Sequence, residues 1–384
     1  MSCMNDAKKG YRSYPLCDSH VHLAFPIHVN GTAHMLESFM AYFGLEGLCL
    51  LALPHSSRAK ATDPANNVKA LYLKHVLSAR RPGRRIYAFG GLYHHFDARD
   101  TAQGLLAQVK ALKSAGFDGL KLLYGKPPLR RRLGVGLDDS LFAEVWRFCE
   151  KERFPVTLHP GDPAEFWRAG ENGEPPVYGP DDTPLETIRT EIRNVLSACP
   201  ELDITLCHFA FLADDIGRAD RLLSSYPGVK FDLAPGSEMF YHFSQDPSSW
   251  RDFFIRHSKR ILFGTDTDNW GDPDRLEGCE HCFSYPFNLV RSGLEGKAPF
   301  RFEDRDYGLL TPLSLPESAL EDIYFRNLIS RLGEPKSVDA DALNAEAERL
   351  LALSQAGLSA DSGAERQRLN RESLETICTQ LRPR

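Results

Sequence analysis

The sequence has no long apolar run, and its charge is close to balanced. No run of about 18 consecutive apolar residues occurs, so no membrane span is expected. The net charge of −6 gives no electrostatic reason to expect nucleic acid or a membrane as a partner. The first ten residues lack the apolar core of a signal peptide, so we expect a cytoplasmic protein.

The common cysteine and glycine motifs are also missing. The nine cysteines are scattered, and we expect them to be reduced. The segment Cys279-Glu-His281-Cys282 has the wrong spacing for a zinc-binding pair and no second pair follows, so no metal is expected there. No GxGxxG motif follows the first predicted strand, which disfavours a doubly wound dinucleotide-binding sheet.

Eight short apolar runs predict strands that are buried on both faces. The first run ends at His22, and the others span 45–53, 85–92, 119–124, 155–159, 202–208, 229–233 and 260–266. Helical patterns separate most of these runs, with apolar stripes over 101–115, 139–153 and 187–198. This alternation predicts a closed (β/α)₈ TIM barrel, with an open doubly wound sheet as the alternative.

The last third of the chain departs from this alternation. Residues 267–316 show little periodicity and are expected to form an irregular part of the barrel rim, whereas 317–332 predict the last barrel helix. Residues 334–384 are charged and rich in Ala and Leu, with helical patterns around 340–353 and 364–381. We therefore expect a catalytic barrel over 1–333 and a C-terminal helical extension over 334–384. We expect the extension to pack on the barrel or on another subunit, and in the second case the protein would be a homo-oligomer.

Metal-binding side chains stand at the predicted strand ends. His20 and His22 point to the same side of the first strand, because side chains alternate along a strand. Later strand ends carry further polar residues, namely Lys121, Tyr124, His159, His208 and Asp266. All strand ends surround one mouth in a barrel, and imidazoles with a carboxylate are ligands for zinc, iron or manganese. The pattern predicts a metal site.

These residue types also suggest catalytic roles. Asp266 can bind a metal and accept a proton from water, and His208 can donate to or polarise the attacked group. Each has a structural alternative, since Asp266 can instead cap a helix or turn and Asp18 can simply support His20. The joint placement at separate strand ends favours the metal site.

Loops at the mouth are expected to hold a small-molecule substrate. His55 and Arg58 follow the second predicted strand, and Lys121 and Tyr124 stand at the fourth. Because loops at this face of a barrel carry specificity, we expect these four residues to contact substrate. Lys121 could alternatively serve as an ion-pair partner.

The chain resembles the amidohydrolase superfamily, in particular the amidohydrolase-related (amidohydrolase 2) group, over roughly 14–333. The resemblance rests on six motifs: Asp18-Ser-His20-Val-His22, Gly119-Leu-Lys121-Leu, His159-Pro-Gly-Asp-Pro, Cys207-His208-Phe, Phe263-Gly-Thr-Asp266 and Ile323-Tyr-Phe-Arg-Asn327 with its following Leu-Ile-Ser-Arg-Leu-Gly333. It implies a metal-dependent hydrolase of amide, lactone or related bonds. The alternative is a non-oxidative decarboxylase of aromatic or unsaturated acids on the same fold.

The resemblance also implies residue roles. It implies one divalent metal, for which zinc is favoured, held by His20, His22, His159 and Asp266. His208 would be the catalytic acid or base, or a ligand of a second metal in two-metal members. Lys121 stands where some superfamily members carry a carboxylated lysine that bridges two metals, so a second metal and this modification both stay open.

Overall fold

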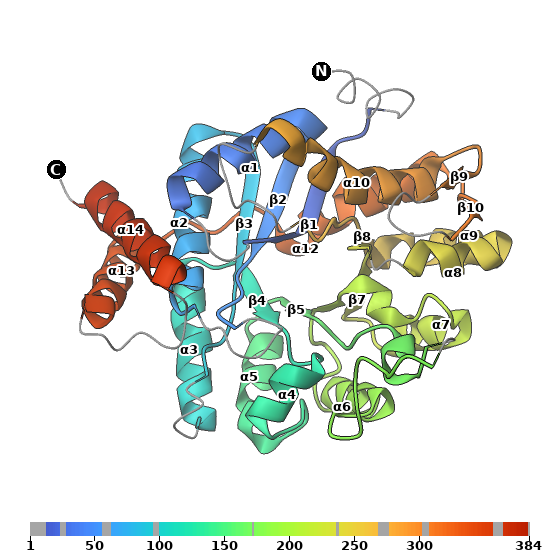
Figure 1. Ribbon diagram of the computed structural model, residues 1–384, viewed down its shortest axis with the longest axis horizontal. Helices are drawn as coiled ribbons and strands as arrows, with labels where there is room; N and C mark the ends of the chain where they lie inside the picture. Colours follow the sequence, from blue (N-terminus) through green and yellow to red (C-terminus); the bar gives the residue numbers. More distant parts are fainter. Residues whose placement is uncertain are drawn as a thin grey trace.

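Figure 1 shows the computed structural model, in which helices surround a central set of strands. The structure describes residues 13–23, 28–55, 63–94, 100–170, 173–235, 238–267, 276–301, 307–355 and 364–382. Eight parallel strands pair in chain order. They are β1 (Leu16–His22), β2 (Leu45–Leu51), β3 (Arg85–Gly90), β4 (Gly119–Leu122), β5 (Val156–Leu158), β6 (Ile204–Leu206), β7 (Val229–Asp232) and β8 (Ile261–Leu262). The predicted (β/α)₈ barrel is confirmed.

The barrel is nearly closed by the segment that follows β8. The Ser19 amide donates to the Phe263 carbonyl at 3.0 Å, and the His22 amide donates to the Thr267 carbonyl at 2.8 Å. Val21 also bridges Thr267 in parallel register. These bonds bring the residues after β8 alongside β1, so Asp266 lies next to the two histidines of β1.

Helices cover the outside of the barrel, as the alternating pattern predicts (Figure 1). The helices up to the eighth strand are α1 (Val29–Phe43), α2 (Ala65–Arg80), α3 (Ala102–Ala115), α4 (Pro127–Leu133), α5 (Ser140–Lys151), α6 (Leu185–Ala198), α7 (Ile216–Ser225), α8 (Met239–Gln245) and α9 (Pro247–Arg256). Beyond it come α10 (Leu276–Glu295), α11 (Glu317–Glu321), α12 (Asn327–Leu332), α13 (Ala340–Gln355) and α14 (Ala364–Leu381), with a two-stranded ribbon of β9 (Phe300–Arg301) and β10 (Leu309–Leu310). A π-helical turn, Asp322–Arg326, joins α11 to α12.

The expectation of an irregular segment over 267–316 is wrong in one respect, because α10 occupies Leu276–Glu295. Pro286 lies inside this helix, and proline removes a backbone donor that a helix interior uses. Gly278 and Gly293 lower the local helix propensity further. Burial of Val290 and Leu294 supplies the tertiary packing that overrides these signals.

Two other sequence expectations can be compared with the described residues. The six cysteines whose side chains are described are all free and buried, namely Cys17, Cys49, Cys149, Cys199, Cys207 and Cys378. The side chains of the Cys279–Cys282 segment lie outside the described part of the chain. No described helix is both long and apolar enough to cross a membrane.

The C-terminal extension forms the two predicted helices, α13 and α14, which lie beside α2 at the edge of the barrel (Figure 1). A buried polar cluster joins α14 to the start of α2. Lys69 Nζ is 3.0 Å from Asp63 Oδ2, and both side chains are fully buried. Asn370 of α14 donates to Asp63 Oδ1 at 3.0 Å and accepts from Lys69. The extension is therefore anchored by hydrogen bonds between Asn370 and a buried ion pair at the start of α2.

Replacing Lys69 with methionine is expected to lower the free energy of unfolding by about 3 kcal/mol, because the Asp63 carboxylate stays buried without its cation. Urea denaturation followed by circular dichroism measures this loss. The control is Arg368→Ala on α14, which removes a solvent-exposed ion pair with Glu372 and should cost less than about 1 kcal/mol. Equal losses in the two variants would contradict a dominant role for the buried cluster.

Candidate metal centre

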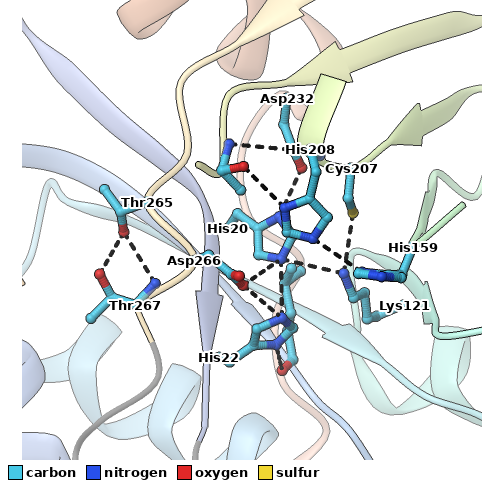
Figure 2. Close-up of polar contacts among 12 residues, drawn as sticks. His20, His22, Lys121, His159, Cys207, His208, Asp232, Thr265, Asp266 and Thr267 are labelled. Carbon is cyan, nitrogen blue, oxygen red and sulfur yellow. Dashed lines mark hydrogen bonds and ion pairs between the residues drawn. The ribbon is translucent and has the colours of Figure 1, made fainter. Parts of the chain in front are cut away.

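The two β1 histidines converge as strand alternation predicts. His20 Nε2 and His22 Nε2 are 3.0 Å apart, and both rings are buried. The other nitrogen of each ring has a partner outside the centre: His20 Nδ1 is 2.8 Å from Asp232 Oδ2, and His22 Nδ1 is 3.2 Å from the Leu51 carbonyl. The Nε2 atoms therefore face each other across the mouth of the barrel (Figure 2).

Asp266 joins this pair from the segment after β8. Its Oδ1 lies 3.2 Å from His20 Nε2 and 3.3 Å from His22 Nε2. Its side chain keeps 35% exposure, so one part of the carboxylate is accessible from the mouth. Its φ of +57° is in the left-handed region, and the bond from its amide to the His20 carbonyl at 2.9 Å holds it there.

His159 and His208 form a second imidazole pair. His208 Nε2 is 3.0 Å from His159 Nδ1. The outer nitrogens again have partners, since His208 Nδ1 is 3.0 Å from the Ala234 carbonyl and His159 Nε2 is 3.3 Å from Asp162 Oδ1. The His20 and His208 rings lie 5.3 Å apart between centroids, which connects the two pairs into one cluster.

The sequence pattern placed these candidate residues at the ends of strands, but the structure places several of them beyond the strands. His159 follows the end of β5 by one residue, and Asp266 lies four residues beyond β8. His208 begins a short turn, His208–Phe211, in which all four residues have φ between 51° and 55°. Side-chain and backbone hydrogen bonds in the mouth, rather than sheet pairing, fix these residues.

Asp232 is the residue that sequence reasoning missed. It ends β7 and is fully buried. Its Oδ2 contacts His20, and its Oδ1 accepts from the His208 amide at 2.7 Å. Burial alone would raise the pKa of Asp232, but the charge of His20 and its hydrogen bond lower it to about 2. Its position at the end of the seventh predicted strand was the available signal.

The protonation of the cluster depends on burial and on neighbouring charges. Burial, with the charge of Lys121, lowers the pKa of His22 to about 4 despite the opposing Asp266. Burial also lowers the pKa of His159 and of His208, so both are neutral near pH 7. The pKa of His20 is raised well above its usual value, because the electrostatic effects of Asp232, Cys207 and Asp266 outweigh burial and the charge of Lys121.

Lys121 and Asp18 support the cluster from two sides. Lys121 Nζ lies 3.4 Å from His20 Nε2 and 3.2 Å from Cys207 Sγ, and no carboxylate among the described residues is within ion-pair distance of it. Asp18 Oδ1 accepts from the His20 amide at 3.0 Å, and Asp18 Oδ2 accepts from the Thr265 hydroxyl at 2.6 Å. Asp18 thus supports His20 and ties β1 to the segment after β8.

The predicted substrate contacts His55 and Tyr124 lie in a separate hydrogen-bonded cluster. The Tyr124 hydroxyl bonds His94 Nε2, and His94 Nδ1 faces Asp100. The His94 amide donates to His55 Nε2 at 2.7 Å. His55 and Tyr124 are each 3% exposed. Arg58 lies outside the described residues.

The donor set fits a divalent metal. Four imidazoles each have an outer nitrogen occupied by a carbonyl or carboxylate and an inner nitrogen aimed at the cluster. Two acceptor nitrogens 3.0 Å apart repel each other unless a proton or a cation lies between them. His20, His208 and Asp266 offer ligand atoms within 4.8 Å of one another, and His20, Cys207 and Asp232 form a second such group. His22 and His159 lie beside the first group. His22 Nε2 is 3.0 Å from His20 Nε2, and His159 Nδ1 is 3.0 Å from His208 Nε2.

Comparisons with known proteins identify the family of the chain. The family model described as Amidohydrolase matches residues 17–327. A search of curated proteins finds no match to this chain.

Solved structures resemble the chain in fold. An uncharacterised TIM-barrel protein from Bordetella bronchiseptica is 15% identical with a TM-score of 0.50, and the match covers 83% of this chain and 100% of that chain. A 2,6-dihydroxybenzoate decarboxylase from Rhizobium is 16% identical with a TM-score of 0.50, over 83% of this chain and 99% of that one. A protein described as amidohydrolase II is 16% identical with a TM-score of 0.51, over 83% and 100%. At these identities the similarity shows the barrel fold alone.

Proposed function

Because the chain belongs to the amidohydrolase family, we propose that it is a metal-dependent hydrolase of an amide, lactone or related bond in a small molecule. One observation carries the proposal: inner imidazole nitrogens face each other at 3.0 Å in both histidine pairs, and each outer nitrogen has an acceptor. This arrangement is the one in which a neutral imidazole binds a metal with its outer N–H held by a second residue.

We propose His20, His22, His159 and Asp266 as the metal ligands and His208 as the catalytic acid or base. His208 would become a ligand if a second ion binds, since it belongs to the same group of ligand atoms. Zinc is the proposed metal, because imidazole and carboxylate ligands suit it. When bound, the metal supplies Lewis acidity that polarises a substrate oxygen and acidifies water.

The remaining chemistry belongs to the side chains. The Asp266 carboxylate is ionised and partly exposed, so it can accept a proton from the attacking water. His208 is neutral, because burial lowers its pKa, so its Nε2 can take over the proton that Asp266 accepts from water and pass it to the leaving group. The Lys121 ammonium lies 3.4 Å from His20 Nε2 and can stabilise negative charge that develops on the substrate. We retain His55, Tyr124 and Arg58 as proposed substrate contacts.

One observation is compatible with both the proposed hydrolase and the alternative, a decarboxylase. Lys121 is 2% exposed, and its ammonium has no carboxylate partner among the described residues. A buried ammonium without a counter-ion favours an anionic ligand, such as a substrate carboxylate. Such a ligand would suit a decarboxylase as well as a hydrolase of acidic lactones.

Assays with purified zinc-loaded enzyme separate the two reactions. The substrates are a panel of γ-lactones and N-acyl compounds and a panel of hydroxybenzoate-type acids, with ring opening or acid release followed in a pH-stat and CO₂ followed by gas chromatography. We expect hydrolysis in the first panel, with metal-free enzyme as the control. CO₂ release from the second panel without any hydrolysis in the first would overturn the hydrolase proposal.

A further inference from the structure

The loop after β5 places a buried carboxylate against a proposed metal ligand. Asp162 is 3% exposed, and its Oδ1 lies 3.3 Å from His159 Nε2 and 2.5 Å from Lys126 Nζ. Its second oxygen, Oδ2, accepts a hydrogen bond from the Tyr178 hydroxyl. Three side chains from different parts of the chain thus converge on Asp162, and Tyr178 alone of these three contacts Oδ2.

Tyr178 is held in place by the same loop. Its amide donates to the Phe166 carbonyl at 2.9 Å, and its ring packs on Trp167 with centroids 4.7 Å apart. Trp167 Nε1 in turn donates to the Thr183 carbonyl at 3.1 Å. The Tyr178 hydroxyl is therefore held against Asp162 by residues of the loop between β5 and α6.

The backbone of His159 is fixed independently of this loop. Its amide donates to the Leu122 carbonyl at 2.8 Å, and its carbonyl accepts from the Gly125 amide at 2.9 Å. Gly125 allows this close approach, since a Cβ there would lie 2.2 Å from the His159 carbonyl oxygen. What stays adjustable is the imidazole ring and the nitrogen that carries its proton.

Asp162 determines which nitrogen of the His159 ring carries the proton. A carboxylate beside Nε2 favours the tautomer in which Nε2–H donates to it. Nδ1 then keeps its lone pair and faces His208 Nε2 at 3.0 Å, toward the cluster. If Asp162 turned away, the ring could carry its proton on Nδ1 and lose the inward-facing lone pair.

We propose that Tyr178 is a positioning residue of the metal centre, which acts through Asp162 to hold the His159 lone pair toward the metal. This inference rests on the proposed function insofar as it takes His159 to be a ligand. The loop after β5 then contributes to metal affinity although Tyr178 contacts no proposed ligand. By linkage, metal binding also stabilises the packing of Tyr178 on Trp167.

Titration of the metal-free protein with Co²⁺ tests the inference. Tyr178→Phe keeps the ring and removes only the hydroxyl, and it is expected to raise the Co²⁺ Kd about tenfold, as loss of an outer hydrogen-bond partner typically does. Asp162→Asn should raise it at least as much. Tyr226→Phe is the matched control, because it removes a hydroxyl that contacts Ser197 on the outside of the barrel. Urea midpoints confirm that each variant is folded.

Tryptophan fluorescence emission gives a second measurement, which Tyr178→Phe would leave unchanged if Tyr178 had a purely structural role. Co²⁺ is expected to change the Trp167 contribution, obtained by difference from Trp167→Phe, and Tyr178→Phe should remove most of that change. A wild-type Co²⁺ Kd in folded Tyr178→Phe would overturn the inference. If His159→Ala weakens Co²⁺ binding while Tyr178→Phe does not, the ligand set stands and only the inference fails. If neither weakens binding, the His159 assignment fails together with the inference.

Discussion

Asp266→Asn is expected to lower kcat by about 10³-fold while leaving the protein folded. Asparagine keeps the shape of the side chain but removes the charge that accepts a proton and binds a cation. The Asp266 side chain is 35% exposed, so its replacement leaves no deeply buried unpaired group. Turnover at saturating metal and substrate measures the first effect, and the urea midpoint measures the second.

A control at a second, similarly exposed aspartate tests whether loss of any surface carboxylate lowers kcat. Asp220 is 38% exposed and pairs with Arg256 and His257 away from the mouth, so Asp220→Asn should retain wild-type turnover. If Asp266→Asn retained more than about a tenth of wild-type kcat, its role as proton acceptor would be contradicted.

His22→Ala is expected to weaken metal binding by roughly 10²- to 10³-fold. The variant lacks one of the four proposed ligands, and each ligand contributes part of the free energy of metal binding. The inner nitrogen of His22 lies 3.0 Å from His20 Nε2 and 3.3 Å from Asp266 Oδ1, so its removal takes a donor from beside two other proposed ligands. Competition with a chelator of known zinc affinity measures the Kd.

The control for this variant is another histidine. His34 lies exposed on α1, and His34→Ala should bind zinc as the wild type does. An unchanged zinc Kd in His22→Ala would contradict the proposed ligand set, even if activity were lost, because the loss would then need another cause.

The barrel and the proximity of the candidate histidines were both predictable from the sequence, because both depend on local patterns. Alternation along β1 determines that His20 and His22 share a side, and parallel pairing determines that strand ends share a mouth. Neither inference needs knowledge of tertiary contacts.

Other features depend on contacts that no local pattern records. Asp232 supports both His20 and His208, yet in the sequence it is one acidic residue at a strand end among many. The left-handed φ values of His208 and Asp266 are held by tertiary hydrogen bonds and have no propensity signal. The contact between Asp63 and Asn370 joins residues that are 307 positions apart. Such features required the structure.

Metal content of the wild-type protein tests most directly whether the histidine cluster is a metal centre. The purified protein is incubated with zinc, desalted and analysed by inductively coupled plasma mass spectrometry. We expect about one zinc ion per chain, and up to about two if His208 helps to hold a second ion. Less than about half an ion per chain in folded protein would contradict the account, because catalytic zinc sites are normally filled.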